Sequence, residues 1–307
     1  MPRRSSRATG PAVAGVLVLM FAALVLAAAP QGGSSASVPR VDVLDAHRLP
    51  LGDGRVSPGP ASGMVMSCMT RFRPAARIHA GDWIQGDTWD LTAKPHVQGE
   101  ITWPDAEFAI TTTGTGRDVS RVLTGNGLPV ETATGRFPIA RRDPAFAFDP
   151  NPNGIAAQPV LLTLPRDPVE AAHATCVPMG MIGIALNGVA IYNALDDAGR
   201  DAVAHEVQDL CSGHPQARGQ YHYHGPSECL PDQDGVETLI GYALDGFGIY
   251  SRYDAAGREL TNADLDECHG RVSAIDWDGR RVEMYHYVLT REYPYTVGCF
   301  RGGRASE

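Results

Sequence analysis

The chain has 307 residues, 43 % of them apolar and 20 % charged, which is enough apolar material to bury an ordinary core. Its formal net charge of −9 argues against a nucleic-acid partner, because phosphate binding needs a basic surface. Composition therefore indicates an acidic globular protein and leaves its activity open.

The N-terminus has the pattern of an export signal. Arg3, Arg4 and Arg7 precede an uncharged run, residues 12–29, that is rich in Val, Leu and Ala. We predict that residues 1–29 are a signal peptide and that the protein is exported to a periplasmic or extracellular location. An uncleaved membrane anchor is the alternative, since the run is marginally long enough to span a bilayer. The membrane would be a partner only through this segment.

Residues 30–62 are Gly, Ser, Pro and Ala with scattered charge and no periodicity, which predicts a flexible linker. From residue 63 to 165, short β-branched runs alternate with turn residues and predict a β-rich part of a domain that spans 63–303. The Asp149–Gly154 stretch begins like a calcium loop. A rigid turn is the better interpretation, because Val160 stands where that loop needs a bidentate Glu.

The second half contains an internal repeat. Residues 182–192 align with residues 240–250, and each copy has an Asn-Gly or Asp-Gly pair between apolar runs, which predicts a hairpin. We place the repeats at 182–230 and 240–300. The predicted fold is a mainly β, disulfide-stabilised β-rich domain with an internal duplication in its C-terminal half and few short helices.

Six cysteines, an even count in a chain predicted to be exported, favour three disulfides over a thiolate metal site. Six cysteines allow 15 connectivities. Treating the repeats alike gives Cys211 with Cys229 and Cys268 with Cys299, and leaves Cys68 with Cys176; crossed pairs between the repeats also respect the symmetry. We prefer the internal pairs because the first closes a short loop, worth ~3 kcal/mol in the chain-entropy model.

The Gln220–Gly225 stretch, Gln-Tyr-His-Tyr-His-Gly, carries the sharpest chemical pattern. In an extended strand its two histidines share one face about 7 Å apart, close enough to converge on one metal ion. Neutral imidazoles suit copper and zinc, which are the two cofactors that we predict. An aromatic strip that simply packs is the alternative. The candidate ligands are His222 and His224 with either His214 or His286. Asp209 and His205 would orient an imidazole through its other nitrogen or serve as alternate ligands.

Several motifs together resemble the YHYH-domain proteins. They are the Gly213–His224 run, the Leu244–Tyr250 segment, Leu265–Cys268 and Tyr293–Phe300. The resemblance covers roughly Met64 to Gly303 and implies an exported protein, but it brings no activity with it. The second repeat reads Tyr285-His286-Tyr287-Val288 and lacks a partner for His224, so any site is asymmetric.

Three functions fit this pattern. The first is an exported protein that binds a metal ion through the Tyr-His-Tyr-His motif. The second is a metal-free secreted structural or binding module that binds a protein or glycan. The third is a metal-dependent hydrolase or oxidase. A nucleophile elbow, a phosphate-binding loop and an H-E-x-x-H helix are absent from the sequence, so whether the protein is an enzyme stays open.

Overall fold

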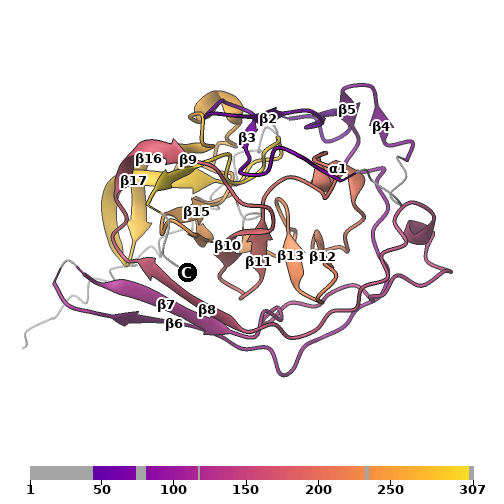
Figure 1. Ribbon diagram of the computed structural model, residues 1–307, viewed down its shortest axis with the longest axis horizontal. Helices are drawn as coiled ribbons and strands as arrows, with labels where there is room; N and C mark the ends of the chain where they lie inside the picture. Colours follow the sequence, from indigo (N-terminus) through magenta and orange to yellow (C-terminus); the bar gives the residue numbers. More distant parts are fainter. Residues whose placement is uncertain (1–43, 74–80, 117, 232–234, 304–307) are drawn as a thin grey trace, which may run out of the picture. The chain divides into compact units, whose positions relative to one another are not determined.

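A mixed sheet of eight strands forms the centre of the fold (Figure 1). We describe a computed structural model of the chain over residues 44–73, 81–116, 118–231 and 235–303. Across the sheet the strands follow the order β12-β13-β11-β10-β14-β15-β17-β16. Their bounds are β10 (Met181–Ala185), β11 (Ala190–Tyr192), β12 (Gly213–Pro215), β13 (Tyr221–Tyr223), β14 (Leu239–Ala243), β15 (Gly248–Tyr250), β16 (Gly270–Trp277) and β17 (Arg280–Val288).

Both predicted hairpins are present in this sheet. Strands β10 and β11 pair antiparallel, and so do β14 and β15. In each loop the glycine N–H donates to a carbonyl at the end of the first strand: Gly188 to Ala185 and Gly246 to Ala243, both at 2.9 Å. The two glycines have φ of 83° and 93°, a left-handed conformation that residues with a Cβ rarely adopt. The Asn-Gly and Asp-Gly pairs therefore form the hairpin turns that the sequence predicts, because glycine adopts the positive φ that these turns need.

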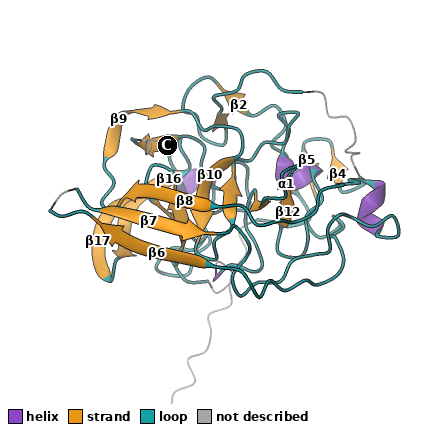
Figure 2. Cartoon of the chain, turned by 60° about the horizontal axis from the view of Figure 1, so that its bottom comes forward, coloured by secondary structure: helices purple, strands orange, loops and turns teal. Residues whose placement is uncertain are grey.

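A three-stranded antiparallel sheet packs against the large one. It consists of β6 (Phe108–Thr113), β7 (Ser120–Gly125) and β8 (Val160–Pro165), which lie side by side in Figure 2. Leu123 and Leu164 of this sheet pack on Ile184, Tyr242 and Trp277 of the large sheet. The β-rich character predicted for residues 63–165 is confirmed here. The apolar contacts between the two sheets stabilise the half of the large sheet that contains β14 to β17.

Three smaller sheets are formed by the short strands of the described residues. Strand β1 (Leu49–Pro50) pairs with β5 (Thr88–Trp89), which also pairs with β4 (Ile84–Gln85). Strand β2 (Val56–Ser57) pairs with β3 (Val65–Met66), and β9 (Glu170–Thr175) pairs with β18 (Phe300–Gly302).

Part of the predicted linker belongs to the fold. Residues 44–62 carry β1 and β2, and Leu49 is only 1 % exposed in a cluster with Trp83 and Trp89. The Gly- and Pro-rich composition suggested a flexible linker, but this part of the chain packs on the domain. The Gly52 N–H, for example, donates to the buried Asp201 carboxylate at 2.9 Å. The predicted signal peptide, residues 1–29, and the start of the linker lie outside the described residues.

Helices are few and short in the described part of the chain, as predicted. They are α1 (Ala202–His205) and the 3-10 turns η1 (Pro144–Ala147) and η3 (Asn262–Asp264). Asp201 caps α1 by accepting from the Ala204 N–H. None of these described helices has the length and apolar character that a bilayer crossing needs.

Three disulfides join the cysteines in the preferred pairing. Cys68 bonds to Cys176, Cys211 to Cys229, and Cys268 to Cys299. Three such bonds are typical of a protein in an oxidising, extracytoplasmic compartment.

Thiol titration of the unfolded, unreduced protein should find no free thiol, because all six cysteines are paired. Titration after reduction of the same sample provides the control and should find six. Two or more thiols before reduction would contradict the pairing and would return cysteine to the candidate metal ligands.

Candidate metal centre

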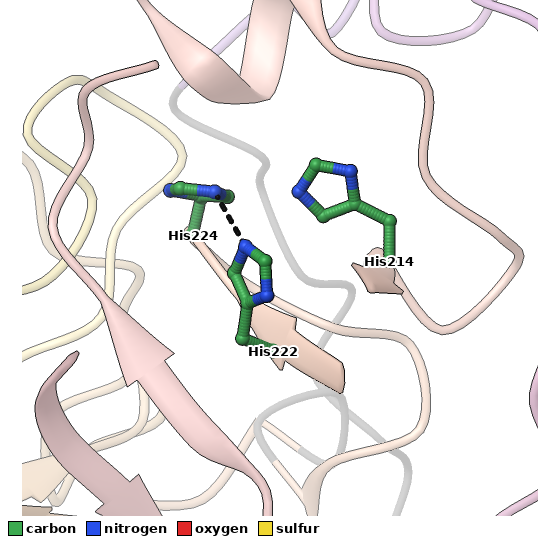
Figure 3. Close-up of side chains that lie close together, drawn as sticks. All are labelled: His214, His222 and His224. Carbon is green, nitrogen blue, oxygen red and sulfur yellow. Dashed lines mark hydrogen bonds between the residues drawn. The ribbon is translucent and has the colours of Figure 1, made fainter. Parts of the chain in front are cut away.

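Two neighbouring strands at one edge of the large sheet bring three histidines together (Figure 3). Strands β12 and β13 pair antiparallel with His214 directly opposite His222. Tyr221 and Tyr223 point into the main core cluster, so the alternation of the strand places His222 on the other face. His224 follows β13 and turns its ring back toward His222, as Figure 3 shows.

The three imidazoles are buried and converge. Their side chains belong to residues that are only 3–4 % exposed. One ring nitrogen from each lies within 4.8 Å of the corresponding atom of the other two. The structure thus brings together His222, His224 and His214, which is one of the two ligand sets that the sequence left open.

The hydrogen bonds of His222 and His224 fix which nitrogen carries the proton. The Nδ1 atom of His222 lies 3.1 Å from the Gln220 carbonyl oxygen, and the Nδ1 atom of His224 lies 2.6 Å from the Asn193 carbonyl oxygen. A carbonyl oxygen only accepts, so both Nδ1 atoms donate, and each neutral ring presents a lone pair at Nε2. These two Nε2 atoms face each other at 3.0 Å. At this distance the two nitrogens are held together either by a proton on one of them or by a cation that both contact.

His214 completes this arrangement with unsatisfied atoms. Neither of its ring nitrogens has a hydrogen-bond partner among the described residues, although the residue is only 4 % exposed. A buried polar atom without a partner costs roughly 1–3 kcal/mol, so native structures usually supply one. A metal ion held by Nε2 would satisfy one of these two nitrogens.

Glu206 is a fourth polar group at the centre, and sequence reasoning missed it. It follows α1, and its Oε2 lies 3.3 Å from the Nε2 of His214 and 3.2 Å from the Nε2 of His224. The same oxygen is buried and makes no hydrogen bond with good geometry in the described structure. Carboxylate oxygens accompany imidazoles in many zinc sites, so Glu206 fits the donor set.

Burial and mutual charge set the protonation of this cluster. Burial alone would raise the pKa of Glu206, but His214 and His224 against its carboxylate hold that pKa well below its usual range. Burial opposes the cation of His214, yet the Glu206 carboxylate outweighs it and the pKa of His214 is raised. Burial, together with the charges of His214 and His224, lowers the pKa of His222 well below its ordinary value. His222 is therefore neutral at pH 7.

The cluster opens onto a polar cavity and is braced by an aromatic ring. Tyr192 of β11 stacks on His222 with ring centroids 3.8 Å apart, and its hydroxyl donates to the Gln220 side chain at 2.5 Å. A cavity of about 460 Å³ adjoins the three histidines and Glu206, and its other walls include Tyr192 and Met179. The buried cluster thus lies directly beside a cavity that is lined by polar groups.

His286 lies elsewhere in the sheet. It stands in β17, where its ring packs edge-on against Tyr250 with centroids 5.1 Å apart and its Nδ1 lies 3.2 Å from the Met284 carbonyl oxygen. Burial lowers its pKa to about 4, which keeps it neutral. The structure does not bring this ring to the other three.

Asp209 and His205 are engaged in hydrogen bonds that hold the fold. The Asp209 carboxylate accepts from the backbone N–H groups of Gly135, Cys211 and Gly213 and from the Tyr221 hydroxyl. The Nε2 of His205 lies 2.9 Å from the carboxylate of Asp53. Asp209 touches the strand that carries His214 and the residue before His222, so it positions the ligand strands rather than the rings.

His205 is also buried, at 5 % exposed. The turn at Asp149–Gly154 is held by its own contacts: Asp149 accepts from the Val207 N–H, and the Asn151 side chain donates to the Pro215 carbonyl.

Comparison with known proteins gives one match. Residues 161–259 match the model of the YHYH protein family. No curated protein and no solved structure matches the chain. The matched segment contains β10 to β15, the three converging histidines and Glu206, which agrees with the resemblance drawn from the motifs. The chain therefore carries a YHYH protein family domain over residues 161–259.

Proposed function

We propose that this protein binds one transition-metal ion, copper or zinc, through the Nε2 atoms of His214, His222 and His224. One observation carries the proposal: a ring nitrogen from each of three buried histidines lies within 4.8 Å of the other two, and in His222 and His224 the Nδ1 protons are committed to backbone carbonyls, which leaves Nε2 as the ligand atom. A metal ion at this point would bind all three rings.

The donor set suits these metals in kind and in spacing. Imidazole is a common ligand of both, with metal–nitrogen bonds of about 2.0–2.1 Å to zinc. Ligand nitrogens on a tetrahedral ion therefore lie about 3.3 Å apart. The separation of 3.0 Å between His222 and His224 is close to this value, so a small shift of one ring completes the geometry. Glu206 supplies a fourth donor or neutralises part of the ion's charge.

The metal-free alternative is a secreted module whose histidines are core polar groups. It would hold these groups with protons alone, one between the Nε2 atoms of His222 and His224 and one between His214 and Glu206. The convergence of three ring nitrogens within 4.8 Å of one another, beside a carboxylate, favours the metal.

The enzymatic alternative depends on a free coordination position. A hydrolase or oxidase needs water or substrate on the ion, and the cavity of about 460 Å³ beside the rings offers room for either. Binding of the metal is the step that all forms of this proposal share, and it is the first to test.

We also propose that the domain arose by internal duplication. The large sheet has two halves with the same strand order. Counted from the edge to the middle, one half is β12-β13-β11-β10 and the other is β16-β17-β15-β14. At the middle of the sheet Ile184 pairs with Tyr242, two residues that the sequence alignment makes equivalent. The parallel pairing of β11 with β13 recurs between β15 and β17.

A close packing contact recurs in the two proposed copies as well. A Cβ at Gly213 would lie 2.2 Å from the Tyr221 ring, and one at Gly270 would lie 2.2 Å from the Tyr285 hydroxyl. The second copy has Arg271 where the first has His214, and Val288 where the first has His224. Only the first copy thus keeps the donors for a metal ion.

Export remains our proposal for the compartment. The three disulfides support it, since they persist in oxidising surroundings. The basic and apolar N-terminal run supports a signal peptide or an anchor.

Elemental analysis of purified protein tests the metal directly. Protein purified without added metal, or offered copper and zinc separately at neutral pH, should hold one equivalent of one of them. Failure to retain either would overturn the proposed function.

Single alanine variants decide the third ligand. His214→Ala should weaken metal binding by at least about a hundredfold, since loss of a group that only hydrogen-bonds to a ligand already costs about 10–100-fold. His286→Ala removes a histidine of similar burial and should leave the affinity unchanged, because its ring packs on Tyr250. Competition with a chelator of known affinity measures both. The opposite result would place the ion between the two halves of the sheet.

A further inference from the structure

All three proposed ligands lie inside one covalent ring. The Cys211–Cys229 disulfide closes an 18-residue separation that contains His214, His222 and His224. His214 stands three residues after the first cysteine and His224 five residues before the second. Only a few residues therefore separate the disulfide from the first and the last of the three ligands.

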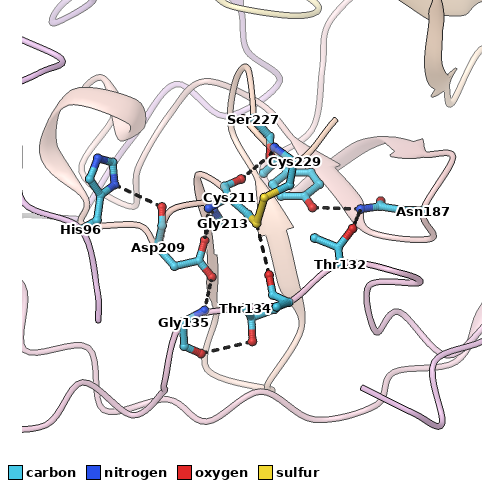
Figure 4. The surroundings of a disulfide bond; sticks show 12 residues. His96, Thr132, Thr134, Gly135, Asn187, Asp209, Cys211, Gly213, Ser227 and Cys229 are labelled. Atoms are coloured by element: carbon cyan, nitrogen blue, oxygen red, sulfur yellow. Dashed lines mark hydrogen bonds between the residues drawn. A yellow bond between two sulfur atoms is a disulfide. The ribbon is translucent and has the colours of Figure 1, made fainter. Parts of the chain in front are cut away.

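This disulfide lies beside a cavity, and Figure 4 shows the residues around it. Both cysteines line a cavity of about 620 Å³, together with the segment 131–135 and the exposed Leu210. Cys211 is 5 % exposed, whereas Cys229 is an exposed residue. A thiol can therefore reach the bond from the Cys229 side.

Each of the other two disulfides lacks one of these two features, exposure to solvent or a position around the metal ligands. Cys268 and Cys299 are both 0 % exposed, so a reductant cannot reach that bond in the folded protein. Cys68 is exposed, but its bond to Cys176 encloses no part of the ligand loop. Only Cys211–Cys229 combines exposure with a ring around the metal ligands.

Non-covalent contacts hold the same ends more weakly. The Ser227 hydroxyl donates to the Cys211 carbonyl, and the Cys211 N–H donates to Asp209 at 3.0 Å. These bonds persist when the disulfide opens, so the loop loosens rather than unfolds.

We infer that the Cys211–Cys229 disulfide is a redox clasp of the metal centre, whose reduction by an external dithiol weakens metal binding. This inference rests on the proposed function. A thiolate of the dithiol attacks the Cys229 sulfur, the bond breaks, and Cys211 leaves as a thiolate that takes up a proton. The second thiol then attacks the mixed disulfide and releases Cys229. The dithiol becomes a disulfide, and two electrons and two protons reach the protein.

Opening the ring raises the conformational freedom of the ligand loop, which the metal must then restrict. The Asp209 and Ser227 contacts retain part of the order, so we expect affinity to fall by about ten- to a hundredfold. By linkage, the metal protects the disulfide by the same factor.

The test compares metal affinity in two matched double variants. Cys211→Ser/Cys229→Ser opens the ring without adding thiol ligands and should bind at least about tenfold more weakly than oxidised wild type. Cys68→Ser/Cys176→Ser removes the other exposed disulfide and should bind as wild type does. Equal affinity in all three proteins would overturn the clasp while leaving the proposed function intact. Absence of metal from oxidised wild type would overturn both.

A measurement on wild type alone avoids any folding defect of the variants. Dithiothreitol redox buffers, with and without free zinc held constant by a chelator, reduce the protein, and trapped thiols are located by mass spectrometry. Metal should lower the reduction midpoint of Cys211–Cys229 by about 30 mV for each tenfold of coupling. The midpoint of Cys68–Cys176 should not move. A midpoint of Cys211–Cys229 that is independent of metal would overturn the clasp.

Discussion

The double variant His222→Ala/His224→Ala is expected to bind neither copper nor zinc, and to lose the stabilisation that metal gives the wild type. At a free metal concentration of about a thousand times Kd, a ligand that binds only the folded state stabilises it by about 4 kcal/mol. For a domain of this size that raises the Tm by roughly 10 °C. Thermal unfolding with and without metal measures the shift, which should vanish in the variant.

The metal-free proteins distinguish this function from its alternative. If the rings were packing groups, removing two of them would lower the metal-free Tm, because each deletion leaves a cavity. If they are ligands, the main bonds of the rings are those to the metal, which the metal-free wild type already lacks, and the metal-free Tm should stay within roughly 5 °C of wild type. His286→Ala is the matched control and should keep the metal-dependent shift. A large loss of metal-free stability together with no shift in wild type would favour the packing role.

The sequence was informative wherever local chemistry decides the structure. Asn187-Gly188 and Asp245-Gly246 predicted two hairpin turns because glycine tolerates the positive φ that these loops need. The alternation of Tyr and His predicted which rings share a face, since side chains in a strand alternate. The parity of the cysteines, combined with the repeat, predicted the disulfides.

The sequence could not supply what tertiary packing decides. The choice between His214 and His286 depended on which strand pairs with β13, and the structure gives that place to β12. Glu206 reaches the rings from the turn after α1, where neither periodicity nor spacing indicated it. His205 meets Asp53, a residue of the stretch that composition had assigned to a linker. Each of these contacts depends on how separate segments pack in the folded chain, which no local sequence pattern shows.

The second large effect concerns Asp209, which the sequence offered as a metal-site residue. Its carboxylate is 1 % exposed and accepts from three backbone N–H groups and from the Tyr221 hydroxyl. Removing the acceptor leaves these donors buried without partners, at roughly 1–3 kcal/mol for each. Asp209→Ala should therefore lower the free energy of unfolding by at least about 4 kcal/mol, measured by denaturant titration of the oxidised protein.

A surface aspartate with a similar set of bonds provides the control for Asp209. Asp254 accepts from the N–H groups of Ala256 and Arg258 and pairs with the half-exposed Arg258 side chain. Water replaces these bonds at an exposed turn, so Asp254→Ala should cost no more than about 1 kcal/mol. Asp209→Ala should also weaken the metal centre, because its bonds hold Gly213 beside His214 and Tyr221 beside His222. Equal losses of stability in the two variants would mean that the buried carboxylate does not hold the ligand strands.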